Sequence, residues 1–178
     1  MESATALLLR RTRYSETSLI VTWLTEEHGK VKTIAKGALR PKGVFSGKLD
    51  LFFEVAIAYQ RSSRSELHTL REAVLRTPFD GLRRDFGRME LACYFVELVE
   101  LAIEPDHPEP EIYDLLLRGL RYLESHPANL RALLHFENEL ATALGIQGDG
   151  PGIAAHTALL RTLHRLPTAR PGLVAKMA

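Results

Sequence analysis

The chain has 178 residues, a formal net charge of +1 and a hydrophobic fraction of 46%. This length is enough for one ordinary domain or two small ones, each with a hydrophobic core. The single cysteine, Cys93, excludes an internal disulfide framework and a cysteine-rich zinc site. We expect a soluble, cytoplasmic protein without a membrane partner, because no apolar run approaches the roughly 20 residues that cross a bilayer and the polar N-terminus lacks a signal peptide's apolar core.

The charges are unevenly distributed along the chain. Residues 1–80 contain 13 Lys and Arg against 9 Asp and Glu, whereas residues 81–150 contain 6 against 13. Residues 151–178 contain 4 basic residues and no acidic one. These changes of sign predict a basic binding module joined to an acidic scaffold.

The first 80 residues show the alternation of apolar and polar side chains that is typical of β-strands. Residues 17–25 are rich in β-branched side chains, and residues 51–59 place their apolar side chains on one face. We expect five short strands, at residues 5–11, 17–25, 31–36, 51–59 and 67–75. Five strands with one long basic loop predict a small Greek-key barrel of the OB-fold type, and an SH3-like barrel is the alternative that the pattern leaves open.

After Pro78 the apolar residues recur with a helical period. We expect helices at residues 88–103, 111–124, 127–144 and 153–166, with a break at residues 148–152. The predicted fold class is therefore α+β, an all-β part followed by an all-α part. The predicted domains are a nucleic-acid-binding OB-fold at residues 1–79, an α-helical domain at residues 80–166 and a flexible C-terminal tail at residues 167–178.

The most informative segment runs from His28 to Leu49, where there is no acidic residue. Its cations are Lys30, Lys32, Lys36, Arg40, Lys42 and Lys48. The first three share one face of the expected strand, and the others fall in the flexible loop that we expect after it. Ordinary protein surfaces mix both signs of charge, so this segment predicts contacts with the phosphate backbone of a nucleic acid.

Several blocks of the sequence are similar to the RecO family of bacterial recombination mediators. The blocks are LTEEHGKVKTIAKGALRPKG, GKLDLFFEVAIAY and ELHTLREA in the first part, then CYFVELVE and HFENELATALGI. The resemblance covers roughly residues 4–146. It implies an OB-fold that binds single- and double-stranded DNA, followed by a helical domain.

The resemblance also implies partners and a cellular role. RecO proteins anneal complementary strands and, with RecR, help to load RecA onto DNA coated by single-strand-binding protein, so a nucleoid-associated location follows. Their helical domain commonly contacts the acidic, apolar C-terminal tail of that coating protein. Many members carry a four-cysteine zinc module after the third helix, but here that region reads GDGPGIAAHTALLRTLHRL. We therefore expect no metal and no other cofactor.

Two further sets of residues are candidates for binding. Tyr14, Phe45 and Phe52 fall on polar faces or in loops, so they are candidates for stacking against bases, whereas Trp23 and Phe53 are expected in the core.

The second set comprises Arg118, Arg121 and Arg131, on or near the second and third helices, which are candidates for binding an acidic peptide tail. Ion pairs within the helices, with Glu111, Asp114 or Glu124, are an equally good interpretation of these arginines.

No arrangement of residues indicates catalysis. The histidines form no HExxH or related ligand set, and no glycine-rich loop matches a nucleotide-binding fingerprint. An enzyme is therefore the poorer interpretation, and the resemblance to the RecO family implies a non-enzymatic mediator of DNA repair. The alternatives are a helical protein–protein adaptor whose barrel has lost nucleic-acid binding, and an RNA-binding OB protein, because phosphate contacts do not distinguish the two sugars.

Overall fold

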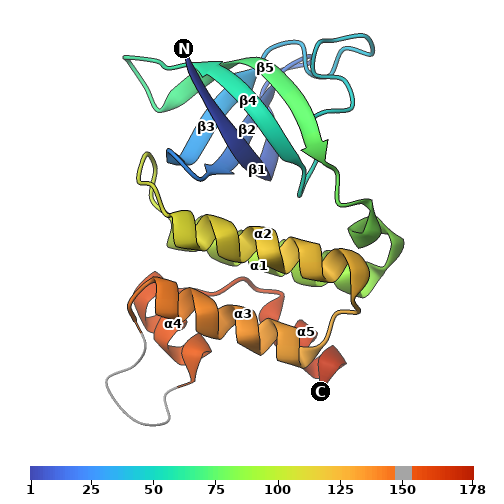
Figure 1. The fold of residues 1–178 in the computed structure, drawn as a ribbon, viewed down its shortest axis with the longest axis vertical. Coiled ribbons are helices and arrows are strands. Elements are labelled where there is room, and N and C mark those ends of the chain that lie inside the picture. The colour runs from blue at the N-terminus through green and yellow to red at the C-terminus, as the bar shows by residue number, and fades with distance from the viewer. Residues whose placement is uncertain (147–153) are drawn as a thin grey trace. The chain divides into compact units, whose positions relative to one another are not determined.

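The structure, a computed structural model, describes residues 1–146 and 154–178. It divides into two compact units: residues 1–78 with 103–113, and residues 79–102 with 114–178. We call them the barrel unit and the helical unit (Figure 1). The break expected at residues 148–152 lies outside the described residues.

The barrel unit contains a closed five-stranded sheet. Its strands are β1 (Glu2–Arg13), β2 (Leu19–Thr25), β3 (Gly29–Ala35), β4 (Glu54–Gln60) and β5 (Leu67–Thr77). They are paired in the order β1-β2-β3-β5-β4, with β1 also pairing with β4, and only the β3–β5 pair is parallel. This arrangement confirms the predicted OB-fold-type barrel followed by helices, and the five predicted strand positions are correct to within a few residues.

The barrel core is built by the alternation that the sequence shows. Along β3, Val31, Thr33 and Ala35 are buried. Trp23 is fully buried, and its indole nitrogen donates a 2.8 Å hydrogen bond to the Thr33 hydroxyl, so the polar atoms of both side chains are satisfied inside the barrel. The expectation that Trp23 and Phe53 belong to the core is confirmed.

One end of the barrel depends on a glycine. Gly29, at the start of β3, has a φ of +65°, and a Cβ atom there would lie 1.9 Å from the His107 carbonyl oxygen. The segment around His107 runs beside β3, where Lys30 and Pro105 form an isolated parallel bridge. Only a residue without a side chain permits this close approach together with a left-handed backbone.

The helices begin with a short 3-10 turn at Asp80–Arg84 and continue as α1 (Phe86–Ala102), α2 (Pro110–Ser125), α3 (Leu130–Ala143), α4 (Ala155–Leu163) and α5 (Arg170–Met177). The first three agree with the predicted ranges to within a few residues, and the fourth is shorter. Asn129 caps α3, where its side-chain oxygen accepts a 2.9 Å bond from the Ala132 amide. None of the described helices is long and apolar enough to cross a bilayer.

The C-terminal residues are not the flexible tail that the sequence indicates. Residues 170–177 form α5, with Pro171 near its start, where a proline is tolerated. Leu173 is buried, and Arg170 forms an ion pair with Glu137 of α3. The prediction was wrong because these anchoring contacts come from residues far away in the sequence.

Candidate nucleic-acid interface and helical groove

The three lysines of the β3 segment lie on the outer side of the barrel, but their surroundings differ. Lys32 and Lys36 are exposed. Lys30 is half-buried, and its ammonium group donates a 2.6 Å hydrogen bond to the Ile103 carbonyl. Lys30 therefore helps to hold the segment at residues 103–107 against β3, whereas the other two lysines present their charge to solvent.

Acidic residues from elsewhere in the chain approach the Lys30 end of β3. Glu66 and Asp106 line a small cavity together with Lys30 and Lys32. Asp106 also forms a 3.2 Å ion pair with Arg61. The segment from His28 to Leu49 lacks acids in sequence, but this part of the barrel surface has charges of both signs in space. A polyanion is therefore attracted less strongly to the Lys30 end of this segment than to its other end.

The Lys30 end of the barrel, which we call the acidic flank, also contains a buried tyrosine, Tyr59, whose ionisation is suppressed. The Tyr59 hydroxyl donates a 2.8 Å hydrogen bond to Glu2. This bond, with a smaller contribution from Arg61, lowers the pKa of the Glu2 carboxyl. Burial, helped by the same bond, raises the pKa of Tyr59 well above its usual range. Both groups therefore keep their charge state near neutral pH, and Glu2 adds a further negative charge to this flank.

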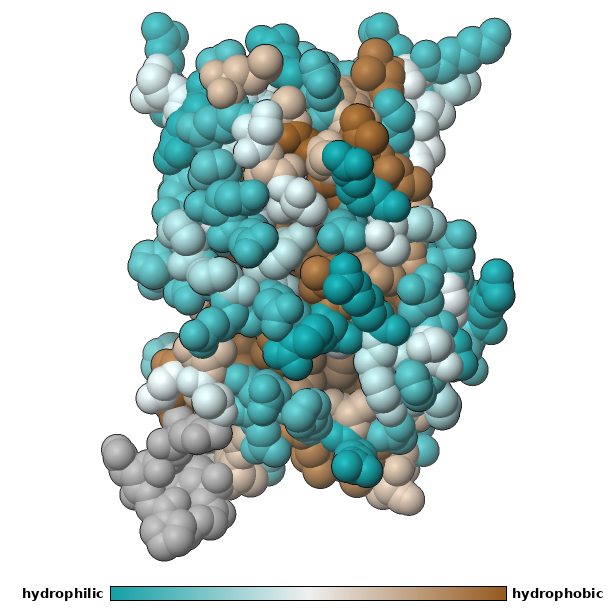
Figure 2. All heavy atoms as spheres, viewed as in Figure 1, coloured by the Kyte–Doolittle hydropathy of each residue, from teal (hydrophilic) through white to brown (hydrophobic). Residues whose placement is uncertain are grey.

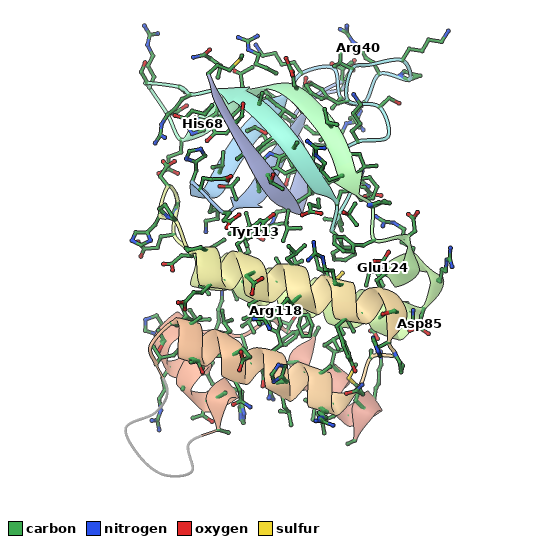
Figure 3. The ribbon with its side chains drawn as sticks, in the orientation of Figure 1. Arg40, His68, Asp85, Tyr113, Arg118 and Glu124 are labelled. Atoms are coloured by element: carbon green, nitrogen blue, oxygen red, sulfur yellow. The ribbon has the colours of Figure 1, made fainter. Side chains whose placement is uncertain are left out.

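The basic loop after β3 is folded, not flexible. Hydrogen bonds between backbone groups three residues apart run along it, from Arg40 to Gly37, from Gly43 to Arg40 and from Lys48 to Phe45. Phe45 and Leu49 are buried in the barrel core and anchor the loop to the strands. The cations Arg40, Lys42 and Lys48 are thus displayed from a fixed backbone; Figure 3 marks the position of Arg40.

Two of the three candidate stacking rings are not accessible. Phe45 is 6% exposed and Phe52 is 2% exposed. Phe52 is held against β1 because its amide bonds to the Leu8 carbonyl, while the Leu8 amide bonds to the Phe53 carbonyl. The expectation of exposed rings at Phe45 and Phe52 was wrong, because loop position in the sequence does not reveal a tertiary anchor.

Tyr14 differs from these two rings. It is 60% exposed and lies in the turn between β1 and β2. This turn is joined to the basic loop, since the Leu39 amide donates a 2.9 Å bond to the Thr17 carbonyl. An aromatic ring and several cations therefore occur at the same end of the barrel, where β1 and β3 end and β2 begins.

Sequence reasoning missed three arginines in this region. Arg10, Arg11 and Arg13 are exposed on the last part of β1. Arg10 pairs with Thr22 of β2, which pairs with Lys32 of β3, so the exposed Arg10 and Lys32 lie on the same face of the sheet, on either side of the buried Thr22. Arg11 is engaged locally, with a 3.1 Å ion pair to Asp50. The run RRTR at residues 10–13 was a visible signal for this group.

We define the basic end of the barrel as these exposed or half-exposed cations of the two neighbouring segments: Arg10, Arg13, Lys32, Lys36, Arg40, Lys42 and Lys48. It brings together five of the six predicted phosphate contacts and adds two arginines. Lys30 lies apart from it, hydrogen-bonded to the segment at residues 103–107. Lys32 lies at its border, because it also lines the cavity that contains Glu66 and Asp106.

A groove lies within the helical unit, between α2 and α3. It has a volume of about 780 Å³. The rings of Phe95 from α1 and Phe136 from α3 stack at 3.9 Å and line it together with Leu115. In the space-filling view, hydrophobic residues are visible between hydrophilic ones over this part of the helical unit (Figure 2). The groove can therefore hold apolar side chains, while charged groups surround them.

Two of the three candidate arginines of the helical unit line this groove. Arg118 and Arg131 line it, and Arg121 does not. Arg118 also forms a 2.7 Å ion pair with Asp114, so the alternative of an ion pair within a helix applies to this residue (Figure 3 labels Arg118). The described residues provide no such pair for Arg131. A groove with apolar lining and two cations suits a ligand that combines apolar and acidic groups.

Within residues 1–146 and 154–178, no group of three or more His, Cys, Asp and Glu side chains is close enough to hold a metal ion. Cys93, half-buried on α1, has a raised thiol pKa, chiefly because of burial. Such a thiol is a poor nucleophile near neutral pH.

Comparisons with known proteins identify the family to which the chain belongs. The family model described as "Recombination protein O N terminal" matches residues 1–79, and the one described as "Recombination protein O C terminal" matches residues 83–149. The proteins named "DNA repair protein RecO" from Rhodopirellula baltica, Anaeromyxobacter dehalogenans and Salinibacter ruber are 36%, 34% and 35% identical over 79%, 80% and 79% of this chain. The matched parts are 52%, 56% and 55% of these relatives, so the chain spans about half of their length. Matches to both RecO models, in order along one chain, show that it belongs to the RecO family.

Proposed function

We propose that this chain acts in DNA repair as a non-enzymatic mediator that binds DNA at the basic end of its barrel. The observation that carries this proposal is the gathering of the basic-end cations from β1, β3 and one folded loop. Membership of a family whose relatives are named for DNA repair supports it. The proposal includes annealing of complementary strands and, together with RecR, assistance in loading RecA.

Annealing follows from charge in this proposal. Two complementary strands repel each other through their phosphates, and a surface that neutralises several phosphates lowers that repulsion while it raises the local strand concentration. Tyr14 is the ring available for base stacking at this end, so we expect weak sequence preference. A binding site made of cations and one aromatic ring suits a protein that must bind DNA of any sequence.

The test is a titration of the protein against labelled single-stranded DNA at several salt concentrations. If about five phosphates are neutralised, the logarithm of the binding constant falls with the logarithm of salt with a slope of about −3 to −4. The annealing rate of complementary strands should fall in the same salt range. Binding that ignores salt contradicts the proposal, and tighter binding of matched RNA than of DNA favours the RNA-binding alternative.

The groove of the helical unit is the proposed site for the acidic, apolar C-terminal tail of single-strand-binding protein. A terminal aromatic side chain would pack against the exposed Tyr122 ring that lines the groove, whose base is the buried pair of Phe95 and Phe136. The tail's carboxylates would approach Arg118 and Arg131. The acidic character of the tail and the cations of the groove are complementary. Such a contact would bring the basic end to DNA that is already coated.

A charge reversal at Arg131 tests this site. Arg131→Glu is expected to weaken binding of a synthetic acidic peptide ending in phenylalanine by about tenfold or more, because it replaces an attraction of about 1 kcal/mol with a repulsion. Fluorescence anisotropy of the labelled peptide measures the change. Arg121→Glu is the matched control, with the same change of charge on an exposed residue that does not line the groove. Equal losses in both variants would place the peptide elsewhere.

A further inference from the structure

A buried carboxylate lies at the centre of the helical unit. Glu137 of α3 is 1% exposed. Arg170 of α5 donates to both of its oxygens, from Nε to Oε1 at 2.6 Å and from Nη2 to Oε2 at 2.8 Å. The Tyr94 hydroxyl of α1 donates to Oε1 at 2.5 Å. The charge of Glu137 is thus compensated by one cation, which comes from the last helix of the described chain.

This network is adjacent to the aromatic pair of the groove. Tyr94 precedes Phe95 on α1, and Phe136 precedes Glu137 on α3. Each helix therefore contributes one residue to the buried network and its neighbour to the stacked rings, which are nearly parallel at 7°. A rotation of α3 that moves Glu137 necessarily moves Phe136, because the two side chains share one rigid helical turn.

We propose that Arg170 is a positioning residue for the groove, and that α5 thereby controls the geometry of the Phe95–Phe136 pair. The proposal rests on the peptide-binding function given above for that groove. Arg170 itself does not line the groove, so it acts through Glu137. Its role is to neutralise Glu137 in place and so to keep the rotation of α3 that holds Phe136 against Phe95.

The physical argument depends on what happens to a buried charge that loses its partner. Without Arg170, the Glu137 carboxylate keeps one donor, Tyr94, in surroundings that exclude water. A buried unpaired carboxylate is strongly unfavourable, and in this proposal the helix that carries it turns or shifts to reach water. Uptake of a proton by Glu137 is the competing outcome, and it would leave the helix and its rings in place. That movement separates the stacked rings and changes the groove. A neutral group at position 137 has no such drive and can retain the bond from Tyr94.

The relative position of the two rings can be measured without a ligand, through a neighbouring glycine. Gly119 of α2 lies against both of them: a Cβ atom there would be 3.2 Å from Phe136 Cε2 and from Phe95 Cδ2. The amide resonance of Gly119 therefore senses the ring currents of the pair. Nuclear magnetic resonance of the full chain, with a titration of the acidic peptide ending in phenylalanine, gives two independent measurements.

The experiment compares three variants of the full chain. Arg170→Met is expected to shift the Gly119 resonance and to weaken peptide binding about tenfold. Arg170→Met combined with Glu137→Gln is expected to return both measurements toward the wild-type values, because the unpaired charge is gone. Lys176→Gln is the control, since Lys176 anchors α5 to Glu90 at 2.8 Å without touching Glu137. It should leave the Gly119 resonance unchanged.

The outcomes are separable. A double variant as defective as Arg170→Met, or a Gly119 resonance that Arg170→Met does not shift, overturns the proposal and leaves α5 a purely structural element. If Arg170→Met does not fold, Arg170→Lys replaces it, with a smaller shift in the same direction. A wild-type protein that fails to bind the peptide, but shows the Gly119 shifts and their rescue, refutes the peptide-binding function while the control of the rings by α5 stands.

Discussion

Reversing three charges at the basic end, as Lys32→Glu, Lys36→Glu and Arg40→Glu together, is expected to reduce the affinity for single-stranded DNA about a hundredfold at low salt. Each lost phosphate contact accounts for about 1 kcal/mol, and each also lowers the magnitude of the salt slope by about 0.7. All three side chains are exposed, so the fold should be retained. Anisotropy titrations at several salt concentrations measure both quantities.

A matched triple variant separates the basic end from net charge. Arg64, Arg71 and Arg76 are also exposed, on β5 and the turn before it, so changing them to glutamate alters the net charge by the same amount. This control should lose less than tenfold in affinity, which corresponds to a loss of less than about 1.4 kcal/mol of binding free energy. Equal losses in both variants would mean that DNA responds to the overall charge of the barrel unit, with no defined site.

Gly29→Ala is expected to destabilise the protein by about 3 kcal/mol or more. A left-handed backbone at an alanine costs about 1–2 kcal/mol, and the new methyl group would lie 1.9 Å from the His107 carbonyl oxygen. The segment at residues 105–107 must then leave β3 and give up its pairing with Lys30. Denaturant unfolding followed by tryptophan fluorescence is a suitable measurement, because Trp23 is buried in the same barrel.

Gly47→Ala isolates the contribution of the close contact. Gly47 has a similar φ of +71°, but no atom lies within 4 Å of a Cβ built there. Its substitution should cost only the backbone strain of about 1–2 kcal/mol. If the two substitutions prove equally destabilising, the contact with His107 contributes nothing, and the argument for a required glycine at position 29 fails.

The strands and most of the helices were predictable because their signal is local. The alternation of Val31, Thr33 and Ala35 with the lysines of β3 reports which side of the strand is buried, and the structure agrees. The antiparallel pairing of Leu19–Thr25 with Gly29–Ala35 across one short turn is likewise a short-range pattern. The same local signal placed the basic segment correctly on an outer face of the barrel.

The rest was not predictable because it depends on contacts between distant segments. Nothing near Lys30 in the sequence indicates the Ile103 carbonyl that it reaches, and the acids beside it, Glu66 and Asp106, come from other parts of the chain. Phe45 looks like a loop residue until the barrel core that it enters is known. α5 was missed for the same reason, since its partner Glu137 lies 33 residues away.

The anchoring of the basic loop by Phe45 and Leu49 has a thermodynamic consequence. A disordered basic loop would become ordered when DNA binds, and that loss of conformational entropy would weaken the complex and add a heat-capacity change. Here the turns from Gly37 to Lys48 are already formed, so the cations meet the phosphates without a folding step. Association should therefore be fast and driven largely by the release of counterions, which lets the protein exchange readily between strands.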